Sequence, residues 1–356
     1  MANAWSVLPE EWKPLLVERG MRAFRADQIL QSLYRDWITD WDQATTLPKD
    51  FREDLKREFP LTPAQEVAVD RSADGTEKLL LKMEDGALVE TVVIPAFSKD
   101  GGLARLTQCV SSQVGCAMGC AFCASGAKGL VRSLKSHEIV AEVMAGRRHG
   151  TLTNLVVMGM GEPFANYDET MRALKIINAG RGPNLGARHI TLSTCGVVPG
   201  FAKLAAEGLQ FELSVSLHAP NDALRSELMP VNRRWPIEEL LAACRDYTRA
   251  TKRVITFEYT LIRGVNDSRA CAEELARRVR TVPMAKVNLI PLSPVDHRPD
   301  LRTPDEATLL MFLDVLMKNR VQTMLRRSRG GDRNAACGQL RLRTERESGA
   351  HANHPA

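Results

Sequence analysis

The stretch Cys116-Ala-Met-Gly-Cys120-Ala-Phe-Cys123 decides how the rest of the chain is interpreted. Its cysteines have the spacing C-x3-C-x2-C and follow directly on a β-rich run at residues 106–110. Three thiolates on one loop can bind three irons of a four-iron, four-sulfur (4Fe-4S) cubane and leave the fourth iron open. An open iron can chelate the amino and carboxylate groups of S-adenosylmethionine, whose sulfonium is then cleaved by an electron from the cluster to give a 5′-deoxyadenosyl radical. The spacing therefore predicts radical chemistry on a loop at the end of a strand.

Two other kinds of cysteine site are alternatives at this stage. A structural zinc site usually needs four ligands in two C-x2-C-like pairs, and no second pair is present in the chain. A ferredoxin-like electron carrier needs a fourth cysteine at short spacing, which is also missing. The radical site is favoured over both.

Short β-rich runs alternate with longer helical patterns from about residue 104 onward. The predicted strands are residues 106–110, 155–158, 189–193, 211–217, 254–262 and 286–290, with a further run at 321–325. Repeated βα units imply parallel strands, and six of them suit a partial (βα)6, TIM-like barrel better than a closed eight-stranded one. The fold class is predicted to be α/β, with a Rossmann-like open sheet as the alternative.

The segments on either side of this barrel pattern have their own character. Residues 1–65 carry three helical patterns and are predicted to form a small helical accessory domain. Residues 66–103 form a hairpin and connecting segment, because two β-rich runs flank Asp85-Gly86. The barrel is expected to cover 104–343, and the polar tail 344–356 is expected to be disordered. Within the barrel, Asn166 and Thr303 are predicted N-caps.

Composition limits the class of protein. Hydrophobic residues make up 44% of the 356 residues and charged residues 26%, which is typical of a globular protein. No signal peptide or membrane-spanning stretch is recognisable, so a cytoplasmic location without membrane contact is expected. Eight cysteines in such a chain are more typical of ligands, catalytic thiols or buried side chains than of structural disulfides. The net charge of +5 permits an anionic partner, and basic clusters occur at 147–148, 233–234, 277–278 and 326–343.

A second motif, Met158-Gly-Met-Gly-Glu-Pro163, ends the second predicted strand of the barrel. Glycines allow a ligand to approach the backbone closely, and a carboxylate can hold a cationic amino group. Taken alone, the motif would be a glycine turn with an exposed glutamate. Its place at a strand's carboxyl end, where barrel active sites are built, favours cofactor binding.

Taken together, these segments resemble the RlmN and Cfr family of radical adenine methyltransferases. The matching segments span most of the chain and are residues 89–95, 109–116, 158–163, 192–199, 216–222, 288–291 and 335–340. The resemblance implies a 4Fe-4S cluster on Cys116, Cys120 and Cys123. It also implies S-adenosyl-L-methionine contacts from Gly161, Glu162, Ser193, Ser216, Leu217 and His218. Ser293 stands where the family usually has an asparagine, so adenosine binding there is expected to differ.

The resemblance also implies a mechanism for methylating carbon 2 of adenine, which is neither nucleophilic nor acidic. By position, Cys337 is the cysteine that first receives a methyl group, Glu90 is the base, and Cys109 forms a transient disulfide with Cys337 as product leaves. Read without the family, Cys337 and Cys109 would be small buried side chains and Glu90 an outward-facing hairpin residue. The remaining thiols, Cys195, Cys244 and Cys271, have no matched role.

The expected substrate is 23S rRNA and also tRNA, with flavodoxin or ferredoxin as electron donor and a monomeric enzyme. Two alternatives remain open. One is a Cfr-like enzyme that methylates carbon 8, and the other is a non-catalytic iron-sulfur protein that binds RNA.

Overall fold

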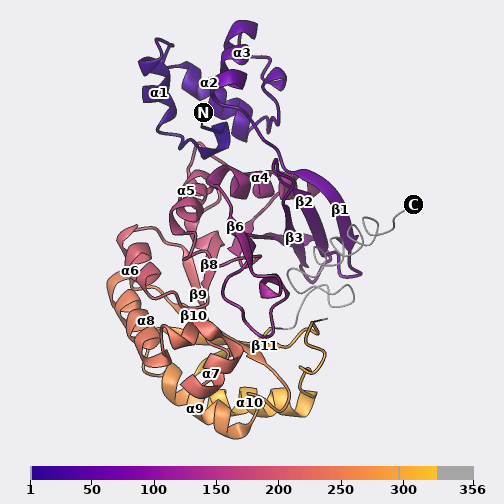
Figure 1. Cartoon of the computed structure of the whole chain (residues 1–356), viewed down its shortest axis with the longest axis vertical. Helices are drawn as coiled ribbons and strands as arrows, with labels where there is room; N and C mark the ends of the chain where they lie inside the picture. The colour runs from indigo at the N-terminus through magenta and orange to yellow at the C-terminus, as the bar shows by residue number, and fades with distance from the viewer. Residues whose placement is uncertain (1, 296, 327–356) are drawn as a thin grey trace, which may run out of the picture.

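A computed structural model describes residues 2–295 and 297–326 (Figure 1). The predicted methyl-accepting residue, Cys337, and the predicted tail at 344–356 lie outside the described residues. The described residues include the accessory segment, the hairpin and the barrel up to Arg326.

One ten-stranded sheet organises the described chain, in the order β1-β2-β3-β4-β7-β8-β9-β10-β11-β12. Its strands are β1 (Gln65–Arg71), β2 (Glu77–Lys82), β3 (Leu88–Phe97), β4 (Leu103–Val110), β7 (Asn154–Val157), β8 (Ile190–Thr194), β9 (Glu212–Ser216), β10 (Ile255–Leu261), β11 (Ala285–Pro291) and β12 (Gln322–Leu325). From β4 onward all neighbours are parallel. Six βα units followed by a seventh parallel strand confirm the α/β class and the parallel barrel-type sheet.

The hairpin is an integral part of this sheet. Strands β1, β2, β3 and β4 are paired antiparallel, so the hairpin extends the parallel sheet on its β4 side. Strand β1 was not predicted from the sequence, and it is the edge strand next to β2. A separate two-stranded ribbon, β5 (Gln113–Gly115) and β6 (Leu130–Ser133), flanks the cysteine loop.

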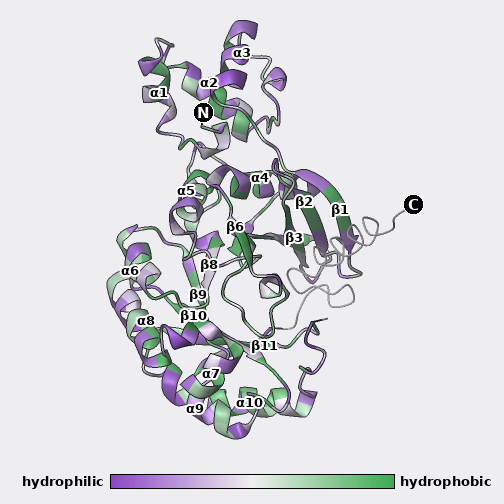
Figure 2. Cartoon of the chain, in the orientation of Figure 1, coloured by the Kyte–Doolittle hydropathy of each residue, from purple (hydrophilic) through white to green (hydrophobic). Residues whose placement is uncertain are grey.

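The helices that connect the parallel strands cover one face of the sheet. They are α4 (Ser136–Gly146), α5 (Tyr167–Asn178), α6 (Pro199–Ala206), α7 (Asp222–Leu228), α8 (Ile237–Thr251), α9 (Arg269–Val279) and α10 (Glu306–Lys318). Apolar side chains such as Leu155, Leu213 and Phe257 are fully buried beneath them. Along α8 and α9, hydrophilic and hydrophobic residues alternate, as expected of helices with one face on a sheet (Figure 2).

The opposite face of the sheet is polar, and the strand register shows which residues share it. Cys109 pairs with Val156, Ser193 with Ser214, and Ser216 with Glu258, and paired residues point to the same side. Because side chains alternate along a strand, this polar face carries Lys78, Glu90, Cys109, Ser193, Ser214, Ser216, Glu258 and Asn288. The candidate functional residues therefore lie on this face and at its carboxyl-terminal rim.

The N-terminal helices α1 (Trp12–Glu18), α2 (Arg25–Tyr34) and α3 (Lys49–Glu58) gather at one end of the molecule (Figure 1). They share an apolar core with the barrel, and polar and aromatic contacts add to it. The Arg147 guanidinium lies 3.6 Å from the ring centroid of Trp37. Arg35 donates to the carbonyl of Gly182 at 2.8 Å. The helical unit is thus attached to the barrel near α4 and α5.

Two expected caps differ in detail. Asn166 stands at the N-cap of α5 but makes no side-chain capping bond, because its Nδ2 donates instead to the carbonyls of Ser112 and Leu134 at 2.8 Å. Thr303 does not cap α10. That helix is capped by Asp305, whose carboxylate accepts from the amide of Thr308 at 2.8 Å. None of the helices in the described residues is long and apolar enough to cross a membrane.

Candidate cofactor site and active site

The cysteine loop is held at both ends by backbone contacts. At Gly115, with φ +79°, a Cβ would lie 2.1 Å from the carbonyl oxygen of Gly129, so only glycine fits. Immediately afterwards, the amide of Cys116 donates to that same carbonyl at 3.0 Å. Further along, the amide of Ala121 donates to the carbonyl of Leu228, at the end of α7, at 2.9 Å. The loop is therefore positioned by β6 on one side and by α7 on the other.

The three thiols of this loop are neighbours in a low-polarity environment. Burial raises the pKa of Cys116 to about 11, and the nearby Cys123 and Glu162 add to the rise. Burial also raises the pKa of Cys120, with Cys123 and Cys116 contributing. Thiolates close together in such a site are stabilised when they bind a cation, so metal binding would release protons.

The donor set of the loop favours a cluster over a single ion. A structural zinc ion usually takes four protein ligands, whereas in a cubane three thiolates can each bind a different iron and leave the fourth iron open. The loop offers three thiols that lie close enough to raise one another's pKa. Cys116, Cys120 and Cys123 are therefore the residues that would hold the cluster.

The glycine motif between β7 and α5 packs tightly against the carboxyl end of β4. A Cβ on Gly159 would lie 2.7 Å from the carbonyl oxygen of Val110. Gly161 has φ +103°, and a Cβ there would lie 2.6 Å from Cβ of Gln113. Both glycines are thus required by close packing and, at Gly161, by backbone conformation.

Glu162 is buried behind this turn, and its carboxylate accepts two backbone N–H bonds. Oε1 accepts from Phe164 at 2.9 Å, and Oε2 accepts from Cys195 at 2.7 Å. Burial raises the pKa of Glu162, and these two amides oppose the rise. The alternative of a glycine turn with an exposed glutamate, which the sequence analysis did not favour, is thus excluded, since Glu162 is buried. Its carboxylate links the ends of β7 and β8 and has lone pairs left for a cationic group.

The other predicted cofactor residues lie at the carboxyl ends of β8 and β9. Ser193 and Ser216 are half-buried on the polar face, whereas Leu217 and His218 are buried directly after β9. Nδ1 of His218 accepts from the amide of Thr260 at 2.8 Å, and its ring lies 4.8 Å from that of Phe122, edge to face. Burial lowers the pKa of His218 to about 3. The imidazole is therefore neutral and touches the cysteine loop.

Arg225 is a site residue that the sequence analysis missed. It is fully buried on α7. Its Nη2 donates to the carbonyls of Cys195 at 2.7 Å and Ser216 at 3.0 Å, and its Nε donates to that of Leu217 at 3.2 Å. One guanidinium thereby joins the ends of β8 and β9, where the cofactor contacts are expected.

The predicted base, Glu90, lies on β3 and is 2% exposed. Its Oε2 is 3.4 Å from Nζ of Lys78, which is 5% exposed on β2. The reading of Glu90 as an outward-facing hairpin residue is thus wrong. Cys109 on β4 is also buried, and the register places it on the same face as Glu90.

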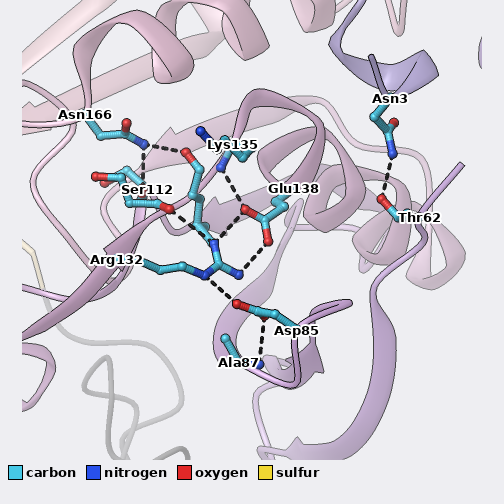
Figure 3. A network of polar contacts seen from close by, with 11 residues as sticks. Asn3, Thr62, Asp85, Ala87, Ser112, Arg132, Lys135, Glu138 and Asn166 are labelled. Atoms are coloured by element: carbon cyan, nitrogen blue, oxygen red, sulfur yellow. Dashed lines mark hydrogen bonds and ion pairs between the residues drawn. The ribbon is translucent and has the colours of Figure 1, made fainter. Parts of the chain in front are cut away.

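An ion-pair network fixes this hairpin to the segment behind the cysteine loop. Arg132 on β6 donates to Asp85 in the hairpin turn at 2.6 Å (Figure 3). The same guanidinium forms a two-pronged contact with Glu138 on α4, at 2.7 and 2.8 Å. Geometry of this kind is the strongest form of a side-chain ion pair. The β3 strand that carries Glu90 is thereby held in place relative to the loop that carries the cysteines.

The structure therefore brings most of the predicted residues onto one sheet face or its rim. Ser293 follows β11 and is half-buried, in keeping with its predicted place at the rim. Cys337 lies outside the described residues. Of the thiols without a predicted role, Cys195 reaches the site through its amide and carbonyl, which contact Glu162 and Arg225.

Comparisons with known proteins agree with this geometry. The family model described as the Radical SAM superfamily matches residues 110–276. The model described as the Ribosomal RNA large subunit methyltransferase N-terminal domain matches residues 7–60.

Similar proteins cover nearly the whole chain. A probable dual-specificity RNA methyltransferase RlmN of Akkermansia muciniphila is 45% identical over 95% of this chain and 95% of its own. A probable dual-specificity RNA methyltransferase RlmN 3 of Opitutus terrae is 47% identical over 93% of this chain and 92% of its own. The crystal structure of a radical SAM methyltransferase from Sphaerobacter thermophilus superposes with a TM-score of 0.89 at 47% identity, covering 95% of this chain and 99% of that one. These matches include the cysteine loop, the glycine motif and the N-terminal helices. The chain therefore belongs to the RlmN family of the radical SAM superfamily.

Proposed function

We propose that the protein is an S-adenosylmethionine-dependent RNA methyltransferase of the cytoplasm that methylates carbon 2 of adenine in 23S rRNA and in tRNA. The observation that carries the proposal is the shared polar face of the sheet. It places a buried carboxylate, Glu90, and a buried thiol, Cys109, beside the strands that end at Ser193 and Ser216. Names of the similar proteins, which include RNA methyltransferases, support the substrate class.

When bound, the cluster and S-adenosylmethionine supply a methyl group and a 5′-deoxyadenosyl radical. Cys116, Cys120 and Cys123 would hold the cluster, and the Glu162 carboxylate would orient the methionyl amine. Ser193, Ser216 and the backbone around Leu217 and His218 would line the rest of the pocket. A neutral His218 accepts no proton near pH 7 because its pKa is about 3. We therefore assign it to packing and orientation.

Three residues of the chain carry the methyl group and the proton in this proposal. Cys337 receives the methyl group on sulfur and carries it to the adenine. Glu90 accepts the proton that leaves carbon 2. Cys109 then attacks the sulfur of Cys337, so that the S–S bond forms while the S–C bond breaks, and the released carbon takes up a proton. A flavodoxin or ferredoxin would supply the electron that starts the reaction and the electrons that reduce the Cys109–Cys337 disulfide to thiols for the next turnover. One copy of the chain carries all of these residues, in keeping with a monomer.

The N-terminal helices offer a surface suited to RNA. Phe24 is 49% exposed, and the guanidinium of Arg25 lies 4.9 Å from its ring centroid. Arg22, next to them, is also exposed. Exposed aromatic rings stack on unpaired bases and arginines contact phosphates, so this patch fits a single-stranded or looped RNA. Two other basic residues fit less well, since Arg278 lies near two carboxylates and Arg147 is half-buried over Trp37.

The test is an anaerobic reaction of the reconstituted protein with methyl-labelled S-adenosylmethionine and ribosomal or transfer RNA, followed by mass spectrometry of the nucleosides. Labelled 2-methyladenosine that disappears with Cys337→Ala is expected. Labelled 8-methyladenosine would move the chain to the carbon-8 reaction instead. An intact cluster without any labelled adenosine would contradict the proposal and favour an RNA-binding iron-sulfur protein.

A further inference from the structure

Arg225 is a buried cation whose described contacts are all with uncharged groups. Its four hydrogen bonds go to the carbonyls of Cys195, Ser216 and Leu217 and to Oδ1 of Asn232 at 2.9 Å. Among residues 2–295 and 297–326, no carboxylate contacts this guanidinium. An arginine stays charged in proteins, and an unpaired charge inside a protein is costly.

The carboxylate in this network belongs to Asp222, which contacts Asn232 and not Arg225 itself. Asp222 accepts from Nδ2 of Asn232 at 3.0 Å, and Asn232 in turn accepts from Arg225. The Asp222 carboxylate also accepts from the amide of Ile237 at 2.8 Å, so it holds the start of α8. Burial lowers the pKa of Arg225, and the charge of Asp222 opposes this effect without contacting the guanidinium.

The place of Arg225 explains what else could balance its charge. Helix α7 carries it between the strand ends and the cysteine loop, and the last residue of the helix, Leu228, accepts from Ala121 inside that loop at 2.9 Å. Leu224 and Leu228, on either side of Arg225 in this helix, pack in one apolar cluster with Cys120 of the loop. Arg225 therefore lies between the ends of β8 and β9 and the cysteine loop.

We propose that Arg225 is an electrostatic positioning residue that raises the reduction potential of the cluster held by Cys116, Cys120 and Cys123. A cluster bound by three thiolates has a net negative charge, which increases by one unit when it takes up an electron. A fixed, buried positive charge beside it favours the reduced state, since the potential of such clusters depends on net charge and surroundings. The inference rests on the proposed cluster and concerns how readily it accepts the electron that starts each turnover.

The rival explanation is that Arg225 is only a clamp for the ends of β8 and β9. Both explanations predict loss of activity when the residue is removed, so activity does not separate them. Two variants separate the effect of the charge from that of the hydrogen bonds. Arg225→Lys keeps the positive charge, and Arg225→Gln removes it. Each variant loses part of the hydrogen-bonding fork.

The experiment is an anaerobic potentiometric titration of each reconstituted holoenzyme, followed by the electron paramagnetic resonance signal of the reduced cluster. For Arg225→Gln we expect a reduced-to-oxidised ratio about tenfold lower than in the parent at the same applied potential, a shift of 59 mV to more negative values. For Arg225→Lys we expect less than half of that shift. Equal shifts in the two variants, or none in either, would overturn the inference.

A second variant leaves the guanidinium in place, in case substitutions of Arg225 do not fold. Asp222→Asn keeps an acceptor for Ile237 and Asn232 but removes the negative charge that partly offsets Arg225. We expect its cluster to be easier to reduce, with a smaller shift of opposite sign. A shift to more negative potential, or no shift, would contradict the electrostatic role.

The control is Arg249→Met, which changes an exposed arginine on α8 and should leave the reduction potential of the cluster unchanged. A parent protein that binds no cluster would show that the proposed function itself is wrong.

Discussion

The carboxyl-terminal rim of the parallel strands and the antiparallel half of the sheet place their polar groups differently. At the rim, Ser193 and Ser216 are half-buried, whereas Ser214 and Glu258, deeper on the same face, are 3% and 5% exposed. In the antiparallel half and on β4, Lys78, Glu90 and Cys109 are 5%, 2% and 7% exposed. Groups that bind a ligand must be reachable, whereas groups that move a proton or form a transient bond work best where water is excluded. We therefore expect the rim of the parallel half to bind the cofactor and the antiparallel half to complete the chemistry.

The largest expected effect comes from removing a cluster ligand. Cys120→Ala should abolish both cofactor cleavage and RNA methylation, because both halves depend on the cluster. Formation of 5′-deoxyadenosine and of labelled nucleoside would be measured in the same reaction. Cys271→Ala on α9, outside the site, is the control and should retain both. Cofactor cleavage that persists in Cys120→Ala would contradict the assignment of the loop.

Glu90→Gln should separate the two halves. RNA methylation is expected to fall by about 10²–10⁴-fold, the usual contribution of a general base, while 5′-deoxyadenosine still forms. Glu84→Gln changes an exposed carboxylate in the same hairpin and should have no effect. If Glu90→Gln and Glu84→Gln behave alike, the antiparallel half does not contain the base.

A substitution in the glycine motif tests the parallel half. Gly161→Ala forces a Cβ against Gln113 and a positive φ on alanine, which together cost about 1–3 kcal/mol. We expect weaker binding of S-adenosylmethionine, measured by calorimetry, because Glu162 follows directly. Gly208→Ala also has a positive φ but has open space around it. It should change unfolding free energy slightly and leave cofactor binding intact, and an equal loss of binding in both variants would refute the packing argument.

His218 makes the parallel half sensitive to acid. Its pKa is about 3 in the folded chain against an ordinary value of 6.5, so below pH 6.5 the unfolded chain binds a proton that the folded chain does not. Stability from this group is complete above pH 6.5 and is lost as pH falls toward 3. Between pH 7 and 5 the loss is about 2 kcal/mol at about 1.4 kcal/mol per unit.

The measurement is denaturant unfolding of the parent and of His218→Asn at both pH values. Asparagine tolerates the φ of +54° and offers an acceptor for the amide of Thr260. The variant should lose about 2 kcal/mol less than the parent between pH 7 and 5. Identical losses would show that the histidine is not buried in its neutral form.

The smallest effect concerns the cation beside the base. Lys78→Met removes the ammonium that lies 3.4 Å from the Glu90 carboxylate, so the buried carboxylate loses the attraction of this cation. RNA methylation should fall about tenfold, which corresponds to about 1.4 kcal/mol in the activation free energy. Lys78→Arg should restore most of the rate, and Lys82→Met, exposed on the same strand, should match the parent. If Lys78→Arg is as slow as Lys78→Met, the positive charge of Lys78 is not what supports methylation.

The sequence was sufficient to predict the parallel strands, because each carries a continuous β-rich run bounded by helical patterns. It did not reveal β1, whose side chains are partly exposed and polar and which is ordered by pairing with β2. The residues on either side of Glu90 in β3 are buried as well, so alternation does not show which way the carboxylate points. Arg225 resembles any basic residue on a short helix. Its burial results from how α7 packs on two distant strand ends, which local pattern does not encode.

The order of strands in the sheet is the same as their order along the chain, once the β5–β6 ribbon is set aside. Each new strand therefore docks on the one synthesised just before it, without waiting for a distant segment. Such an arrangement suits assembly during translation, when the N-terminal part of a chain folds first. It also means that a ribosome that stalls near the end of the barrel would leave a sheet shortened at one edge, with Glu90 and the cysteine loop already in place.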